Sequence, residues 1–298
     1  MKHLLGIKDL KKEEIEKIID LGLEVKKFPE KYYNSLSYKT LAMIFQKTST
    51  RTRVSFESAM TQLGGHAQYL DWRTTNFTLG DLKDEIKCLS RYVDIIMARV
   101  YKHRDIVAMS KASSVPVING LCDLEHPCQI LGDLMTLKEK FSNFYKVKVA
   151  FVGDGNNVCN SLIIGCAKLG IQINVATPKK YQPAKFAVEI GKKLKKLNLT
   201  DNPSKAVKGV DVVYTDTWVS MGEENEKETR MKIFPPYQVN KKLMNLTNNA
   251  YFMHCLPAHR GYEVTDEVLD SKNSIVYDQA ENRLHIQKAI ILTLLKKI

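Results

Sequence analysis

One stretch decides the fold class: residues 41–63, LAMIFQKTSTRTRVSFESAMTQL. The apolar run Leu41–Phe45 predicts a buried strand. Apolar residues then recur at positions 56, 59, 60 and 63, a spacing that predicts one face of a helix. The polar turn Lys47–Arg53 would therefore lie at a helix N-terminus, where unpaired N–H groups and the helix dipole favour an anion. Its hydroxyls and arginines could fork onto a phosphate group.

The same alternation of strand and helix continues along the chain. Buried strands are predicted at 41–45, 95–98, 115–118, 147–152, 171–176, 210–214 and 251–253. Helices are predicted at 10–27, 54–63, 82–92, 105–112, 129–141, 161–169, 184–197 and 281–297. Strands that alternate with helices predict an α/β protein whose parallel sheets are covered on both faces.

The pattern restarts near residue 146, where the polar stretch Ser142–Lys146 precedes a fresh strand. We expect two doubly wound parallel-sheet domains, 1–145 and 146–280, with a cleft between them and joined by interdomain helices. The C-terminal helix, 281–298, is expected to pack back on the first domain. The stretch Thr217–Lys232 is rich in glutamate and has no apolar period, so it predicts a long mobile loop that closes as a lid.

The composition excludes several classes of protein. With 44% hydrophobic and 26% charged residues, the chain is typical of globular proteins, and no apolar run is long enough for a membrane span or a secretion signal. Its six cysteines have no Cys-x-x-Cys spacing, which favours a reducing cytoplasm over a disulfide or zinc framework. The net charge of +12 suggests nucleic acid, but the lysines are dispersed and lack interleaved aromatic residues. We therefore expect no nucleic-acid or membrane partner.

A glycine-rich turn after the strand 147–152 suggests a dinucleotide site, but the pattern is incomplete. Gly153 and Gly155 are present, whereas the third glycine position holds Val158 and no acidic residue follows at the distance that a ribose requires. Asn156 and Asn157 remain at the carboxyl end of a strand, either as ligand-binding residues or as helix caps.

Four other segments carry polar side chains that could do chemistry. His126 and Gln129 share one helix face and could hold a small carbonyl group and its amide, although a lone histidine is more often structural. Asp216 follows a strand and could bind an ammonium group or cap a turn. Cys255 could be a nucleophile, a polar contact or a buried structural residue. Arg283 opens the last helix and alone would be a surface residue. No set of metal ligands with suitable spacing is present.

Taken in order, these motifs resemble one family. Ser49 to Arg53, Arg99 after a strand, His-Pro-Cys-Gln at 126–129, His-Cys-Leu-Pro at 254–257 and Arg283 resemble the motifs of the aspartate/ornithine carbamoyltransferase family. Ser220-Met221-Gly222 and the His-Cys-Leu-Pro element are similar to its ornithine-specific members. The resemblance covers almost the whole chain.

This resemblance implies transfer of the carbamoyl group of carbamoyl phosphate to the δ-amine of L-ornithine, giving citrulline and phosphate. The implied carbamoyl phosphate residues are Ser49, Thr50, Arg51, Thr52, Arg99, His126, Gln129, Cys255, Leu256 and Arg283. Of these, the implied catalytic residues are Arg99, His126, Cys255 and Arg283, and the implied ornithine residues are Asn157, Asp216, Ser220 and Met221. The resemblance implies no cofactor, no metal and no covalent intermediate, and a homotrimer or an assembly of trimers.

Two alternatives stay open at this point. The acceptor could be another amine, namely putrescine, aspartate or an acylated ornithine. A protein of a different class, a Rossmann-like nucleotide- or nucleic-acid-binding protein, would also combine such a core with a basic surface.

Overall fold

The computed structural model describes residues 1–220 and 222–297. Within them the chain divides into two compact units, residues 1–135 with 282–297 and residues 136–281. The chain passes from the first unit to the second within one helix, α5 (Pro127–Lys140), and returns within another, α12 (Val276–Leu294). Each unit has its own parallel sheet, so the prediction of two doubly wound α/β parts is confirmed.

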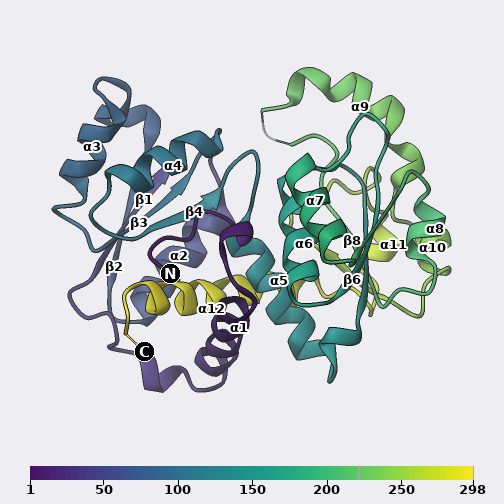
Figure 1. Ribbon diagram of the computed structural model, residues 1–298, viewed down its shortest axis with the longest axis horizontal. Coiled ribbons are helices and arrows are strands. Elements are labelled where there is room, and N and C mark those ends of the chain that lie inside the picture. The colour runs from purple at the N-terminus through teal and green to yellow at the C-terminus, as the bar shows by residue number, and fades with distance from the viewer. Residues whose placement is uncertain (221, 298) are drawn as a thin grey trace. The chain divides into compact units, whose positions relative to one another are not determined.

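The first unit contains a four-stranded parallel sheet in the order β2-β1-β3-β4. Its helices and strands are α1 (Lys12–Lys27), β1 (Thr40–Phe45), α2 (Thr50–Gln62), β2 (His66–Asp71), α3 (Leu82–Leu89), β3 (Ile95–Arg99), α4 (His103–Ala112) and β4 (Val117–Leu121). Alternate side chains of β1 and β3, such as Ile44 and Ile96, pack with Ile106 of α4 on one face. Figure 1 shows α2 and α12 on the opposite side of this sheet from α3 and α4.

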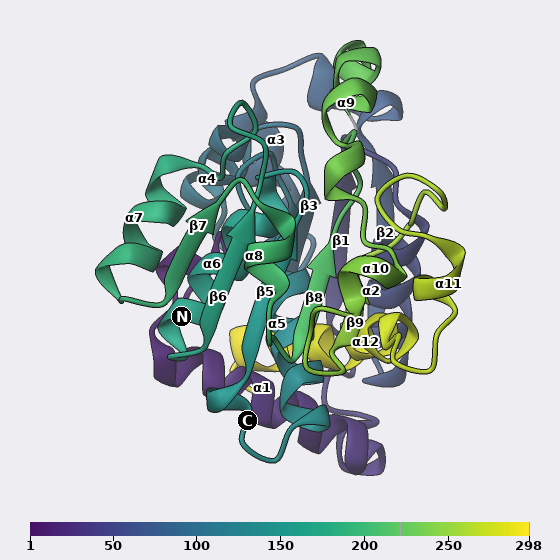
Figure 2. The same cartoon turned by 90° about the vertical axis from the view of Figure 1, so that its right-hand side faces the viewer.

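The second unit contains a five-stranded parallel sheet in the order β7-β6-β5-β8-β9. Its strands are β5 (Lys148–Val152), β6 (Gln172–Ala176), β7 (Leu197–Thr200), β8 (Val212–Thr215) and β9 (Tyr251–His254). Its helices are α6 (Asn157–Lys168), α7 (Lys185–Lys193), α8 (Pro203–Val207), α9 (Lys227–Ile233), α10 (Lys241–Met244) and α11 (Asp266–Leu269). Helices α6 and α7 cover one face, whereas α8, α10 and α11 cover the other (Figure 2). On that second face Val152, Phe252 and Phe234 belong to one buried cluster.

Both sheets reverse their strand order at an inner pair of strands. In the first unit the order reverses between β1 and β3, and in the second between β5 and β8. In parallel α/β sheets, ligands bind beyond the carboxyl ends of the strands at such a switch point. The turn after β1 and the end of β3 are therefore expected to bind a ligand, as are the turns after β5 and β8.

Several predicted boundaries differ from the structure. Two of the edge strands, β2 and β7, were not predicted, and the helix predicted at 184–197 ends at Lys193, before Leu197 begins β7. The C-terminal helix begins at Val276 rather than at 281 and ends at Leu294. The prediction of one loop for 217–232 is wrong from Lys227, where α9 begins.

Candidate functional site

The first group of polar residues lies at the switch point of the first sheet. Ser49 is the N-cap of α2, and its Oγ accepts a hydrogen bond from the N–H of Thr52 at 3.3 Å. Thr50, Arg51 and Thr52 form the first turn of that helix, directly after β1. Arg99 ends β3 in register with Phe45 of β1 and is only 6% exposed. The structure thus places Arg99 at the end of the strand next to β1, which leads to the turn before α2.

His126 and Gln129 come from the start of α5. Gln129 is buried, and its Nε2 donates to Oδ1 of Asp133 at 2.8 Å. Its Oε1 accepts a hydrogen bond from Nη1 of Arg283, which is itself 8% exposed on α12. Because one neighbour accepts and the other donates, the orientation of the Gln129 amide is fixed, and its oxygen keeps a second lone pair for a ligand.

The charge around His126 is strongly positive. Burial is the main cause that lowers the pKa of His126 well below its ordinary value, and the charges of Arg283, Arg99 and Arg51 lower it further. The imidazole is therefore neutral at physiological pH and can donate one hydrogen bond. Three arginines from three separate elements act on one neutral histidine, an arrangement suited to a small dianion.

The second group lies at the switch point of the second sheet. Asp216 follows β8, and its carboxylate accepts from Nδ2 of Asn156 at 2.7 Å and from Sγ of Cys255 at 3.0 Å. Asn156 is also the N-cap of α6, since its Oδ1 accepts from the N–H groups of Val158 and Cys159. The helix-cap alternative for Asn156 is therefore confirmed, and the same amide also orients Asp216.

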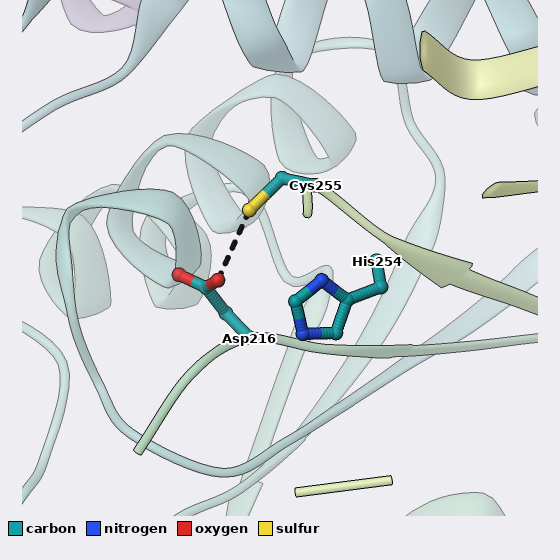
Figure 3. A group of neighbouring side chains, drawn as sticks. All are labelled: Asp216, His254 and Cys255. Atoms are coloured by element: carbon teal, nitrogen blue, oxygen red, sulfur yellow. Dashed lines mark hydrogen bonds between the residues drawn. The ribbon is translucent and has the colours of Figure 1, made fainter. Parts of the chain in front are cut away.

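Cys255 and Leu256 follow β9. Figure 3 shows the Cys255 thiol pointing toward the Asp216 carboxylate, with the His254 ring beside them. The candidate ligand atoms of Asp216, His254 and Cys255 lie within 4.8 Å of one another. However, Nδ1 of His254 accepts from the N–H of Leu256 at 2.8 Å, and its Nε2 lies 3.3 Å from Oε1 of Glu263. Both ring nitrogens of His254 therefore have partners already. Even with all three side chains, the cluster would supply fewer ligands than the four that a structural zinc site uses.

Asn157 begins α6 and Ser220 lies in the turn after β8, while Met221 is outside the described residues. Arg230 of α9 was not predicted from the sequence, although its side chain fixes the turn after β8. Its Nη1 donates to Oδ2 of Asp154 and to the carbonyl oxygen of Trp218, both at 2.8 Å. Burial raises the pKa of Asp154, and the nearby guanidinium opposes that rise. Arg230 therefore joins the turn after β5 to the turn after β8.

The fold and these two groups define a class: an α/β protein with two parallel sheets, one with arginines around a helix N-terminus and the other with a carboxylate–amide cluster. Comparison with known proteins then names the family. The carbamoyl-P binding domain of aspartate/ornithine carbamoyltransferases matches residues 2–139, and the Asp/Orn binding domain of that family matches residues 145–294. The chain belongs to the aspartate/ornithine carbamoyltransferase family.

Individual relatives agree over the full length. Ornithine carbamoyltransferase from Archaeoglobus fulgidus is 51% identical over 100% of this chain and 98% of its own. The solved structure of ornithine carbamoyltransferase from Pyrococcus furiosus has a TM-score of 0.95 at 50% identity, covering 100% of this chain and 98% of that one. The anabolic enzyme from Campylobacter jejuni has a TM-score of 0.94 at 43% identity, covering 100% of both chains.

Proposed function

We propose that this chain transfers the carbamoyl group of carbamoyl phosphate to the δ-amine of L-ornithine, giving citrulline and phosphate. The observation that carries the proposal is the set of three arginines acting on His126, beside the N-terminus of α2. Full-length similarity to proteins named ornithine carbamoyltransferase supports the choice of substrates.

In the first unit, the residues of the α2 turn bind the phosphate group. Ser49, Thr50 and Thr52 supply hydroxyls and backbone N–H groups, and Arg51 supplies charge. Arg99 bridges the phosphate and the carbamoyl oxygen. Because α2 begins directly after β1, the anion is bound by groups that folding has already ordered, so little further ordering is needed.

The carbamoyl group is polarised by donors to its oxygen. His126, neutral because it is buried among arginines, donates to this oxygen together with Arg99. Gln129 accepts from the carbamoyl amide with the lone pair that Arg283 leaves available. Negative charge grows on the oxygen as the amine attacks, so these donors stabilise the transition state more than the ground state. Arginine beside the phosphate stabilises it as the leaving group.

In the second unit, Asp216 binds the α-ammonium group of ornithine. Asn157 and the Ser220–Met221 segment bind the end that carries the carboxylate. Cys255 and Leu256 face the reacting amine and the carbamoyl group, and the Cys255 thiol orients Asp216. The amine attacks as the neutral base, so activity is expected to rise through alkaline pH. We assign carbamoyl phosphate to residues 1–145 with the C-terminal helix and ornithine to residues 146–280.

We further propose a cytoplasmic homotrimer, or an assembly of trimers, that takes part in arginine biosynthesis. None of the six cysteines forms a disulfide, which supports a reducing compartment. In the described part of the chain no helix is both long and apolar enough to span a bilayer. The mass in solution, measured by light scattering, tests the trimer against a monomer of 34.0 kDa.

The direct test follows both products. The protein is incubated with carbamoyl phosphate and ornithine, and citrulline and phosphate are measured together. We expect equal amounts of the two products. The variant Arg51→Met should abolish the formation of both without unfolding the protein. Phosphate release above the rate without protein, with no citrulline formed, would show that the chain hydrolyses the acyl phosphate and would exclude the proposed transfer.

A further inference from the structure

The segment 3–8 lies along the edge of the first sheet and ends at a buried carboxylate. The N–H of Leu4 donates to the carbonyl oxygen of Val117 at 2.9 Å, and the N–H of Asn119 donates to that of Leu4 at 2.7 Å. Nδ2 of Asn119 also donates to the carbonyl oxygen of Leu5 at 2.8 Å. We name residues 3–8 the N-terminal strap: β4 holds its first part at Leu4 and Leu5, and its end enters the short 3-10 helix Ile7–Asp9.

Glu125 receives the end of this strap. Its side chain is fully buried, and its Oε2 accepts from the N–H groups of Ile7 at 2.6 Å and Lys8 at 3.4 Å. The packing leaves no room on the strap side, since a Cβ added at Gly6 would lie 2.1 Å from Oε1 of Glu125. The carboxylate can therefore keep this position only while residue 6 is glycine.

The backbone of Glu125 is fixed as firmly as its side chain. Its carbonyl oxygen accepts from the N–H of Cys122 at 3.1 Å, and its own N–H donates to the Cys122 sulfur at 3.4 Å. The next residue is His126, whose carbonyl oxygen accepts from the N–H groups of Gln129 and Ile130 and so starts α5. One residue thus links the strap to the first turn of α5.

We propose that Glu125 is a positioning residue for the carbamoyl phosphate site, acting by anchoring the N-terminal strap against the turn that carries His126 and Gln129. The inference rests on the proposed function, and Glu125 itself touches neither substrate. A displacement of about 1 Å at a reacting group is enough to lower rates about a hundredfold, so an anchor one residue away from His126 can control catalysis.

The charge of Glu125 makes this anchor depend on pH. Burial raises the pKa of Glu125 to about 7, although the N–H of Ile7 and the ammonium of Lys8 oppose the rise, and Asp9 adds to it. His103 faces the same region, 3.4 Å from Nζ of Lys8, and burial lowers its pKa, so it is neutral near pH 7. An ionised carboxylate accepts the N–H groups of the strap more strongly than a neutral acid. The raised pKa shows that burial outweighs this gain, so ionisation is unfavourable in the docked state and the anchor weakens as the pH rises through 7.

Three variants separate this role from a general loss of structure. Glu125→Ala removes the acceptor, and Gly6→Ala moves the intact carboxylate away. Both are expected to raise KM for carbamoyl phosphate or lower kcat by about ten- to a hundredfold, with KM for ornithine changed by less than about twofold. The double variant should be no worse than the more impaired single one, because both changes break the same contact. The matched control is Glu14→Ala, since Glu14 also accepts a backbone N–H near the N-terminus, from exposed Lys11.

Two further readouts complete the test. Glu125→Gln keeps the acceptor but cannot ionise, so its KM for carbamoyl phosphate, divided by the KM of wild type, should fall between pH 6 and 8. Hydrogen exchange of a peptide covering residues 121–132 should quicken in Glu125→Ala and Gly6→Ala but not in Glu14→Ala. If the wild-type protein is active, and Glu125→Ala and Gly6→Ala both have unchanged kinetics and unchanged hydrogen exchange, the anchoring role is overturned. A wild-type protein that makes no citrulline, yet shows the exchange differences, would instead contradict the proposed function.

Discussion

Replacing Arg230 by methionine should destabilise the second unit and weaken ornithine binding together. The guanidinium is 5% exposed and lies 2.8 Å from Oδ2 of Asp154, which is 6% exposed. It also lies 2.9 Å from Glu223 and 3.1 Å from Glu226, but these carboxylates are 41% and 55% exposed. Exposed partners contribute little, so nearly all of the effect should come from Asp154 and from the carbonyl oxygen of Trp218.

The magnitude follows from what the substitution leaves behind. Methionine fills part of the volume but leaves the Asp154 carboxylate and the Trp218 carbonyl oxygen without their donor. Removing one partner of a buried ion pair costs about 3–5 kcal/mol, because a charge remains buried without compensation. Asp154→Asn in the same protein removes that charge, so the double variant should recover about 2 kcal/mol relative to the sum of the single variants.

Tryptophan fluorescence measures this effect in the relevant unit. The chain has two tryptophans, Trp72 in the first unit and Trp218 in the second. In a Trp72→Phe background, urea unfolding followed at Trp218 reports the free energy of unfolding of the second unit, and KM for ornithine is measured on the same samples. KM for ornithine should rise at least about tenfold while KM for carbamoyl phosphate stays near wild type. A loss below about 1 kcal/mol, or strictly additive single variants, would refute the reasoning.

Three other predictions concern single side chains. The pKa of Glu125 is raised from 4.5 to about 7, so the folded protein binds the proton more tightly than the unfolded chain does. The free energy of unfolding of wild type, relative to that of Glu125→Gln, should therefore fall by roughly 3 kcal/mol from about pH 5 to about pH 8 in urea titrations. Asn156→Ala removes a helix cap and a donor to Asp216, so it should cost about 1–2 kcal/mol in urea unfolding and raise KM for ornithine, whereas Asn156→Ser should restore the cap alone. Arg283→Lys keeps the charge but loses the planar guanidinium that donates to Gln129, so kcat should fall by about tenfold or more in steady-state assays. A kcat equal to that of wild type would contradict a role for that contact.

Much of the fold could be predicted because inner strands of parallel sheets are continuous apolar runs. β3 and β5 are buried along almost their whole length, so their sequences contain the signal. β2 and β7 lie at the sheet edges with mixed exposure, and their polar sequences do not differ from those of loops. Helix α9 was missed for a related reason, since one of its turns is organised around buried Arg230 rather than around an apolar face.

The site residues divide in the same way. Residues that belong to local motifs, such as those of the α2 turn, could be predicted from neighbours in the sequence. Asn156, Arg230 and Glu125 could not be assigned their contacts, because their partners lie 60, 76 and 118 residues away. Each is an ordinary polar residue in the sequence and acquires its role only when the ends of separate elements meet.

The central claim is that the acceptor is the δ-amine of free ornithine, and a panel of amines tests it most directly. The protein is incubated with carbamoyl phosphate and, in parallel, with L-ornithine, putrescine, L-aspartate or an acylated ornithine, and kcat/KM for the ureido product is measured for each. We propose that Asp216, held by Asn156 and Cys255, binds the α-ammonium group, so ornithine should exceed every other amine by at least about a hundredfold. Equal or better activity with putrescine or an acylated ornithine would contradict the account.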